Sequence, residues 1–385
     1  MSGVLRHQFG SKSEVEFRVL RTQADTEIDG GLLGTEPSIN PLNESVLQIA
    51  SGSLQTQLAD HWNLSLRLGE SRDELETFED GQSTGVYDSR RLQGTVQNDI
   101  RWGDNHLITA GLDYFRDKVM GTVDFQTLER DTIGFFGQWQ TTHDRHQFIA
   151  GLRHDKNDTV EDSTTYNLQW AYEINQKFQL TAAYGTAFRA PGFDQLFFPG
   201  FGNPDLRPEK SDTFELGLRG NHEQGYWSFS AYNTVIDDMI AINFSLFRPE
   251  NIQGVRIRGV EGEVNIISPK WRATLNGSYV DHQDDMSGKM LRRRPKGSLN
   301  LSLDRTMGRI SFGTKVLWRS HSFDSDGERN RMEDYSLVDV HLAYAVSQQW
   351  MIRARINNLF DEVYETTNSF NSLDRTVFLS VTYEM

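Results

Sequence analysis

The sequence predicts an all-β protein, an antiparallel transmembrane β-barrel of about 18 strands. Apolar and polar residues alternate with a period of two along most of the chain. Along the chain, short connections between these segments alternate with long ones. Only 37% of the residues are hydrophobic, yet 11% are aromatic. A membrane-spanning barrel has such a composition, because only alternate residues face lipid and aromatic rings gather at the two interfaces.

The alternation is clearest in residues 61–68, where every even position is apolar and every odd position is polar. An α-helix would need apolar residues at positions i, i+3, i+4 and i+7, and this segment lacks them. The pattern recurs at 15–19, 299–303, 352–356 and 377–383, where Phe378 is an exception. The predicted strands are 15–26, 45–58, 62–73, 90–101, 106–118, 131–142, 146–156, 164–174, 178–188, 211–221, 225–240, 255–266, 271–281, 296–305, 309–320, 335–345, 350–358 and 375–384.

The connections predict the orientation of the barrel. Short ones such as 59–61, 143–145 and 347–349 follow every second strand. Outer-membrane barrels have short periplasmic turns and longer external loops, so we expect the long segments to face outward. The long segments are 27–44, 74–89, 119–130, 189–210, 241–254, 282–295, 321–334 and 359–374.

The polar positions of the strands predict a lumen. Arg67, Asn300 and Arg353 lie on the face opposite the apolar residues. A charged side chain facing the middle of the bilayer would cost about 2–4 kcal/mol, so these residues are expected to face water or other polar groups. A barrel of about 18 strands leaves an aqueous space, which either conducts solutes or is filled by another part of the protein.

Charge and composition exclude several classes. A net charge of −15 argues against a nucleic-acid partner, and the absence of cysteine excludes disulfides and thiolate metal sites. The first seven residues lack the apolar core of a secretory signal. We therefore expect either that a signal was removed or that the chain is a fragment.

Four segments carry a family resemblance. Residues 183–220 read AYGTAFRAPGFDQLFFPGFGNPDLRPEKSDTFELGLRG, and residues 251–264 read NIQGVRIRGVEGEV. Residues 356–364 read INNLFDEVY, and the chain ends with RTVFLSVTYEM. In this order and at these distances, the segments resemble the barrel part of TonB-dependent outer-membrane receptors. The resemblance covers nearly the whole chain and implies one barrel domain over residues 1–385.

The segment LRRRPKGSLNLSL at 291–303 and the compact loops are most similar to the cobalamin (vitamin B12) branch of that family. Siderophore receptors share the general motifs. The resemblance therefore implies uptake of a large scarce nutrient across the outer membrane, a corrinoid or alternatively a ferric siderophore. It implies no catalysed reaction and no cofactor.

Complete receptors of this family carry a plug domain inside a barrel of 22 strands. When the strands are counted back from the C-terminus, the resemblance aligns this chain with about strands 5 to 22 of such a receptor. The plug domain has no counterpart in it. Two explanations are open: the chain is part of a longer protein, or it is a plugless passive channel in which 15–26 pairs with 375–384. A TonB complex is an expected partner only if a plug is present.

The candidate ligand contacts are aromatic and basic. Four phenylalanines crowd the long segment 189–210, while Phe244 and Phe247 lie in the next one. They are expected to contact a large ligand, and loop packing or an interface belt is the alternative. A run of three arginines at 292–294 is expected to hold lipopolysaccharide phosphates or an anionic ligand, unless it is a solvated strand end. The predicted site residues are Phe193, Phe197, Phe198, Phe201, Phe244 and Arg292.

The last strand carries an expected assembly signal. Receptors of this family usually end on an aromatic residue that the barrel-assembly machinery reads, and here Tyr383 and Met385 share the outward-facing register. The surrounding partner is expected to be outer-membrane lipid. The sequence Gly-Gln-Ser-Thr-Gly at 81–85 matches a nucleophile motif, but no helix follows it. We assign no catalytic residue and no metal ligand, including among the loop aspartates.

Overall fold

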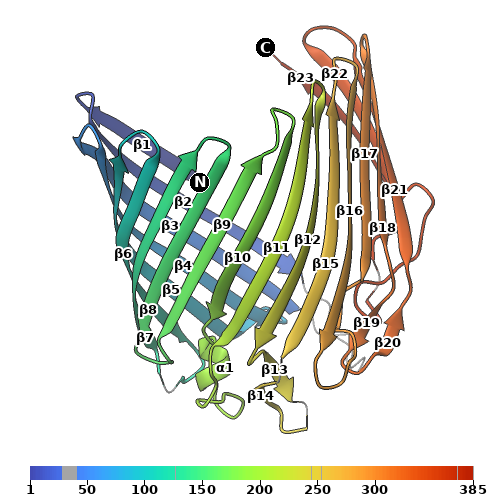
Figure 1. The fold of residues 1–385 in the computed structure, drawn as a ribbon. Coiled ribbons are helices and arrows are strands. Elements are labelled where there is room, and N and C mark those ends of the chain that lie inside the picture. Colours follow the sequence, from blue (N-terminus) through green and yellow to red (C-terminus); the bar gives the residue numbers. More distant parts are fainter. Residues whose placement is uncertain (28–40, 126, 244, 253, 371, 385) are drawn as a thin grey trace. The chain divides into compact units, whose positions relative to one another are not determined.

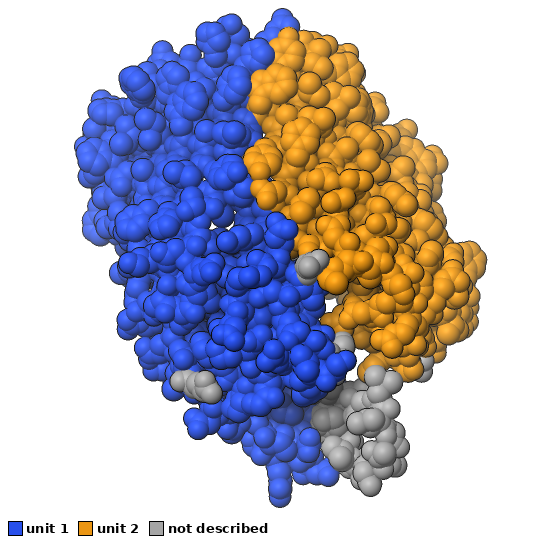
Figure 2. Space-filling view, turned by 60° about the horizontal axis from the view of Figure 1, so that its bottom comes forward, with its two compact units in different colours: residues 1–169, 185–211, 237–252 blue, residues 170–184, 212–236, 253–385 orange. Residues whose placement is uncertain are grey.

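The computed structural model describes residues 1–27, 41–125, 127–243, 245–252, 254–370 and 372–384. Within them the chain is almost entirely antiparallel strand, with one short helix, α1 (Phe193–Phe197). No helix of the described part is long and apolar enough to cross a bilayer. The chain divides into two compact units, coloured separately in Figure 2: unit 1 comprises 1–169, 185–211 and 237–252, and unit 2 comprises 170–184, 212–236 and 253–385.

Unit 1 contains a meander of eight strands. Each strand pairs antiparallel with the next one along the chain, from β1 with β2 to β7 with β8 (Figure 1). The strands are β1 (Ser2–Phe9), β2 (Ser13–Glu27), β3 (Pro41–Ala59), β4 (Trp62–Glu79), β5 (Gln82–Trp102), β6 (His106–Gly121), β7 (Glu129–His143) and β8 (His146–Asn157).

The strand register in unit 1 separates an apolar face from a polar one. Leu66 of β4 lies opposite Leu54 of β3 and Val96 of β5. Its neighbour Arg67 points to the other face, opposite Ser53 and Thr95. Since side chains alternate along a strand, the alternation in the sequence becomes one continuous apolar surface and one continuous polar surface.

Ion pairs mark where the apolar surface of unit 1 ends. On β6 and β7, Tyr114 opposite Ile133 is the last apolar pair of this surface. Two residues further, Arg116 donates two hydrogen bonds to Asp131, at 2.8 and 2.9 Å. Lys118 donates to Glu129 at 2.7 Å. Charged groups on this face are unfavourable in hydrocarbon, so the row places the edge of the lipid-facing band at this level.

The first strand differs from the expectation. Residues 2–9 form β1, which pairs with one edge of β2, while β3 pairs with the other edge. Both edges of β2 are thus occupied, so 15–26 does not form the pairing with 375–384 that was raised for a plugless channel. Each of the 18 predicted strands has a counterpart. With β1 and without the two short hairpins β13–β14 and β19–β20, the described residues hold 19 strands.

The segment 74–89 also differs, because it is not a long loop. β4 continues to Glu79 and β5 begins at Gln82, so only Asp80 and Gly81 form the turn. Both have positive φ angles, 49° and 79°, as the two central residues of a type I′ hairpin turn do. The Gly-Gln-Ser-Thr-Gly sequence therefore lies at the start of a strand that another strand follows.

Four strands contribute residues to both units, and a short hairpin of unit 1 follows them. The strands are β9 (Ser163–Glu173), β10 (Phe178–Arg189), β11 (Glu209–His222) and β12 (Gly225–Asp237), and the hairpin is β13 (Ile240–Asn243) with β14 (Arg248–Asn251).

Unit 2 continues the meander. The part of β12 within this unit pairs with β15, and each following long strand pairs antiparallel with the next. The strands are β15 (Val255–Ile267), β16 (Trp271–Asp284), β17 (Gly297–Met307), β18 (Ile310–Arg319), the hairpin β19 (Ser322–Ser325) and β20 (Arg329–Met332), then β21 (Tyr335–Ala345), β22 (Trp350–Asn357) and β23 (Thr376–Tyr383).

The two faces are equally distinct in unit 2. Leu275, Leu301 and Val316 lie opposite one another on β16, β17 and β18. On the other face, Asn300 donates a hydrogen bond to Asn276 at 2.9 Å. The expected alternation of connections holds along this part of the chain. Turns of two to four residues (268–270, 308–309, 346–349) alternate with the long segments 285–296, 320–334 and 358–375.

Aromatic rings flank the short turns of unit 2 on the apolar face. The Arg305 guanidinium lies 4.6 Å from the centre of the Trp271 ring. Trp350 pairs with Tyr383, and their ring centres are 4.8 Å apart. Tyr383 thus shares a face of the sheet with Trp350. Met385 falls outside the described residues.

Candidate functional site

The long segment 190–208 of unit 1 is held at its start by two hydrogen bonds. The Arg130 guanidinium donates to the carbonyl oxygen of Pro191 at 2.8 Å. The amide of Gly192 donates to the Gln195 side chain at 2.9 Å, which begins helix α1. Arg130 also lies beside Asp117, whose carboxylate accepts two hydrogen bonds from Arg91 at 2.6 and 3.0 Å. The loop is therefore fixed on charged residues of the polar face.

A small apolar core lies beneath the loop. Leu196, Leu206 and Ile240 are each less than 8% exposed and form one cluster. Phe197 and Val160 pack against this cluster. Phe197, one of the predicted ligand contacts, thus takes part in loop packing.

Phe193 lies at the start of α1. Its ring centre is 6.3 Å from that of Phe197, and the Arg130 guanidinium lies 5.1 Å from its ring. A cation over an aromatic face is a favourable contact, so Phe193 helps to hold the helix on the wall.

Phe198 and Phe201 belong to a line of five aromatic rings in unit 1. The successive distances between ring centres are 6.0, 5.8, 6.4 and 5.6 Å, and each pair meets edge to face. We call this set the ring line. Its members, in order, are Tyr87, Phe125, Phe198, Phe201 and Phe247.

The ring line contains one buried ring, Phe125, and ends at its most exposed ring, Phe247. Tyr87 lies on the same face of β5 as Arg91, the polar face. Phe125 is only 4% exposed, Phe198 is 38% exposed and Phe247 is 66% exposed. The line thus connects the polar wall with a solvent-exposed hairpin tip, and it offers apolar surface to a large ligand.

The hairpin β13–β14 that carries Phe247 is fixed at its base. The amide of Ile240 donates to the Glu209 carboxylate at 2.7 Å. The Asn251 side chain donates to the carbonyl oxygens of Arg207 and Asp238, at 3.0 and 2.7 Å. Arg207 and Asp238 also form an ion pair. These bonds attach the hairpin to the segment 190–208.

Near the tip, Glu250 accepts hydrogen bonds from the side chains of Asn243 and Arg248, at 2.8 and 2.9 Å. These bonds favour the ionised form and hold the pKa of the Glu250 carboxyl below its usual value. The exposed end of the ring line is therefore flanked by polar groups that are already paired. Phe244 lies outside the described residues.

Arg292 lies on the exposed connection 285–296 of unit 2, so it is not part of the ring line. Its neighbour Arg293 forms an ion pair with Asp324 at 2.6 Å. The amide of Arg293 also donates to the carbonyl oxygen of Phe323 at 2.6 Å. The basic run therefore holds the β19–β20 hairpin through Arg293.

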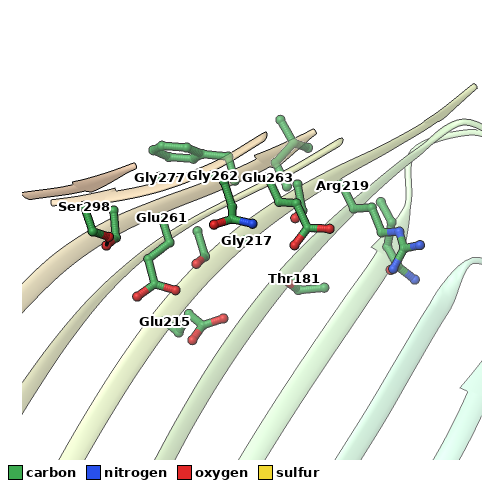
Figure 3. A pocket seen from close by; sticks show the side chains of 16 residues that line it. Thr181, Glu215, Gly217, Arg219, Glu261, Gly262, Glu263, Gly277 and Ser298 are labelled. Carbon is green, nitrogen blue, oxygen red and sulfur yellow. Dashed lines mark hydrogen bonds between the residues drawn. The ribbon is translucent and has the colours of Figure 1, made fainter. Parts of the chain in front are cut away.

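Unit 2 contains a separate polar hollow of about 570 Å³, shown in Figure 3. Small residues open it: a Cβ atom at Gly217 would lie 2.5 Å from the Thr181 hydroxyl. Among its carboxylates, Glu261 accepts a hydrogen bond from Tyr232 at 3.1 Å and Glu263 one from Tyr226 at 2.5 Å. No predicted site residue lines it. In the part of the chain that the structure describes, no three acidic or histidine side chains are grouped to hold a metal ion.

Two members of the ring line were not predicted. Tyr87 falls in a segment expected to be a loop, and Phe125 is isolated in the sequence. Only the folded chain brings them next to Phe198. A search for aromatic residues across all expected long connections would have found both residues, but not the contacts that join them to Phe198.

The sequence matches, over residues 16–359, the protein family described as TonB dependent receptor-like, beta-barrel. Among curated proteins it is similar to the vitamin B12 transporter BtuB of Photobacterium profundum, with 28% identity over 333 residues, or 84% of this chain and 55% of that protein. BtuB of Vibrio vulnificus is 26% identical over 384 residues, or 95% of this chain and 60% of that protein. The chain thus spans a little over half the length of these relatives.

Solved structures show the same fold. The copper transporter OprC superposes with a TM-score of 0.83 at 16% identity. The match covers 99% of this chain and 70% of the OprC chain. The siderophore receptor PiuA from Acinetobacter baumannii also has a TM-score of 0.83, at 13% identity, with 99% and 73% covered. All these proteins are named as transporters or receptors, not as enzymes. Together with the two-faced strands, the family match establishes that the chain belongs to the TonB-dependent receptor β-barrel family of outer-membrane proteins.

Proposed function

We propose that this chain is the wall and the loops of a receptor that takes up a corrinoid such as cobalamin across the outer membrane. The observation that carries the proposal is the similarity to vitamin B12 transporters, which extends over 84–95% of the chain. The fold itself is shared with copper and siderophore receptors, so it does not select the ligand.

In this proposal the two faces of the strands have separate tasks. The apolar face contacts outer-membrane lipid, and the polar face lines the transport path. The last strand, with Tyr383, is the segment that the barrel-assembly machinery reads. Energy-coupled uptake would require a plug that contacts the TonB complex, and that plug would occupy the lumen next to the polar face.

The ring line is the proposed ligand contact. A large ligand needs a largely apolar contact surface with a few polar anchors. Phe198, Phe201 and Phe247 provide this surface beside the paired polar groups of β13–β14. Phe193 and Phe197 support the loop that carries them. Arg292 is proposed as a contact for lipopolysaccharide phosphate or an anionic ligand.

The proposal is tested by measuring radiolabelled cyanocobalamin binding to outer-membrane vesicles from cells that produce this chain. Saturable binding that unlabelled cobalamin displaces, and ferric enterobactin does not, is expected. Displacement by the ferric siderophore alone would contradict the corrinoid assignment and favour a siderophore receptor.

A plugless passive channel is the second candidate, because the polar face and the open hollow of unit 2 offer a hydrated path. Planar bilayer recordings separate the two functions. Large steady currents without corrinoid binding would favour the channel, whereas silent bilayers with corrinoid binding would favour the receptor.

A further inference from the structure

His282, near the end of β16 that meets the connection 285–296, has a buried imidazole with one unpaired nitrogen. The residue is only 2% exposed. Its Nδ1 accepts a hydrogen bond from the amide of Leu291 at 3.2 Å, so the neutral ring carries its proton on Nε2. Nε2 makes no hydrogen bond to the described part of the chain. The ring can therefore keep its bond to Leu291 only while it is uncharged.

The position of His282 is beyond the lipid-facing band. The last aromatic residue on the apolar face of β16 is Tyr279. Two residues further, Asp281 lies opposite Arg258 and forms an ion pair with Lys296 at 2.5 Å. This charged row marks the edge of the band, as the ion pairs of β6 and β7 do in unit 1. His282 follows the row on the polar face, so it can exchange protons with the aqueous medium when it is uncovered.

The surroundings of the ring disfavour its charged form. Burial lowers the pKa of His282 below its usual value. A backbone group of Arg294 acts in the opposite direction, while the charges of Arg294 and Lys296 lower the pKa further. Asp281, on the same strand, is a negative charge nearby, and the uncharged Ile257 lies opposite on β15. Protonation therefore costs the closed structure free energy.

The hydrogen bond from Leu291 helps to hold the connection 285–296 against the end of β16. Next to it, Gln283 and Met290 form an isolated antiparallel bridge. The amide of Asp284 donates to the carbonyl oxygen of Lys289 at 3.0 Å. The first half of the connection is thus folded back on the strand from which it leaves.

The same connection also holds the hairpin β19–β20. The amide of Met290 donates to the Glu328 carboxylate at 3.1 Å, and the Lys289 ammonium donates to the carbonyl oxygen of Gly327 at 3.0 Å. Arg293 adds its ion pair with Asp324. A change that releases the connection from β16 therefore acts on the hairpin as well.

We propose that His282 is an acid-sensitive latch for this part of unit 2. A proton on Nδ1 replaces the acceptor of the Leu291 amide with a second donor, and it places a positive charge in a buried site. Release of the connection 285–296 relieves both effects, and the hairpin β19–β20 is released with it. The two segments thus open together when the medium becomes acidic, whichever ligand the receptor takes up.

The direction and the size of the effect follow from linkage. Opening exposes the ring, and its pKa then returns to about 6.5. Opening therefore takes up a proton below that pH, and the closed form, which is fully stable above it, loses stability as the pH falls. From pH 7.5 to pH 5.5 the equilibrium constant for opening should rise about tenfold. Carboxylic acids ordinarily titrate near pH 4, below this window.

Hydrogen exchange of the chain in phospholipid vesicles tests the latch, once rates are corrected for the intrinsic pH dependence of exchange. In the parent, the opening constants of residues 285–296 and 322–332 should both rise about tenfold from pH 7.5 to pH 5.5. His282→Gln keeps an acceptor for the Leu291 amide but does not titrate, so the rise should vanish. The matched control is His222→Gln, because His222 accepts from the amide of Gln224 at 3.3 Å but is exposed. This control should behave as the parent does.

Three outcomes of this experiment would overturn the proposal. One is an opening constant in the parent that does not change with pH. Another is an equal rise in His282→Gln, which would point to a different group, such as His321 beside Phe323. The third is a rise confined to 285–296, which would show that the hairpin is not released with the connection.

A second measurement leaves His282 unaltered. Met290 is 9% exposed, whereas Met286 on the same connection is 71% exposed. The chain has no cysteine, so Met290→Cys and Met286→Cys each carry a single thiol. The ratio of their reaction rates with an uncharged maleimide largely cancels thiol ionisation, and it should rise about tenfold in favour of position 290 from pH 7.5 to pH 5.5. A constant ratio would overturn the latch. Neither measurement uses a ligand, so the outcome is separate from the proposed function.

Discussion

Replacing Leu66 by arginine should destabilise the folded chain in a bilayer much more than the same change at Ser65. Leu66 lies four residues from Trp62 and four from Glu70, where the apolar face of β4 ends. With a rise of about 3.4 Å per residue and a tilt of about 40°, it lies roughly 10 Å from either edge of that band. Leu66 is therefore near the middle of the hydrocarbon.

The size of the effect follows from this depth. An arginine at the midplane on the lipid face of a barrel costs about 2–4 kcal/mol. The folding equilibrium should shift by roughly 30- to 900-fold, since 1.36 kcal/mol corresponds to a factor of ten. Ser65 lies opposite Gln55 and Gln97 on the polar face, so Ser65→Arg should change stability by less than about 1 kcal/mol.

The assay is urea unfolding in phospholipid vesicles, followed by tryptophan fluorescence from the 8 tryptophans of the chain. Migration of unheated samples in detergent gels reports the folded fraction independently. Equal destabilisation by both substitutions, or a loss of less than about 1 kcal/mol for Leu66→Arg, would refute the assignment of the two faces.

Three further predictions concern unit 1. Arg153→Ala should destabilise the chain by about 1–3 kcal/mol in the same urea assay. The substitution removes the ion-pair partner of Asp113 (2.6 Å) and Asp155 (2.7 Å), whose carboxylates are largely buried. An unfolding midpoint equal to that of the parent would contradict a stabilising role for these ion pairs. Gly81→Val should lower the free energy of unfolding by about 1–2 kcal/mol, and Gly81→Asn should lower it clearly less. The φ angle of +79° disfavours a branched side chain, while no atom within 4 Å crowds an added Cβ. Equal losses of stability would argue against the type I′ turn. Phe125→Ala should speed hydrogen exchange of the residues around position 125 by at least about tenfold, since the one buried ring of the ring line is lost; unchanged exchange would show that the line does not hold this loop.

The strands that cross the lipid band could be predicted because lipid on one face and polar groups on the other impose a two-residue period. β1 was missed because its register places His7 on the apolar face and Val4 on the polar face, which blurs that period. The outer parts of β4 and β5 were taken for a loop for a similar reason. Beyond the band both faces are polar, and cross-strand ion pairs such as Arg72 with Asp88 hold the ladder instead.

The candidate site was only partly predictable for a different reason. Phe198 and Phe201 are close in sequence, so their grouping was visible, and Phe247 lies in a segment that was also recognised as aromatic. Tyr87 and Phe125 join them through tertiary contacts that no local pattern encodes. Exposure of individual rings also depends on how the loops pack, so sequence could not separate Phe197, a packing residue, from Phe247, an exposed one.

The most direct test of the two-faced wall is a scan of single cysteines through residues 63–68 of β4, since the chain has no cysteine of its own. Nitroxide labels in bilayers would be probed with oxygen, which concentrates in lipid, and with a water-soluble nickel complex. Oxygen accessibility should peak at positions 64, 66 and 68, and nickel accessibility at 63, 65 and 67. Accessibilities that rise and fall together, or that follow a period near 3.6 residues, would contradict the account.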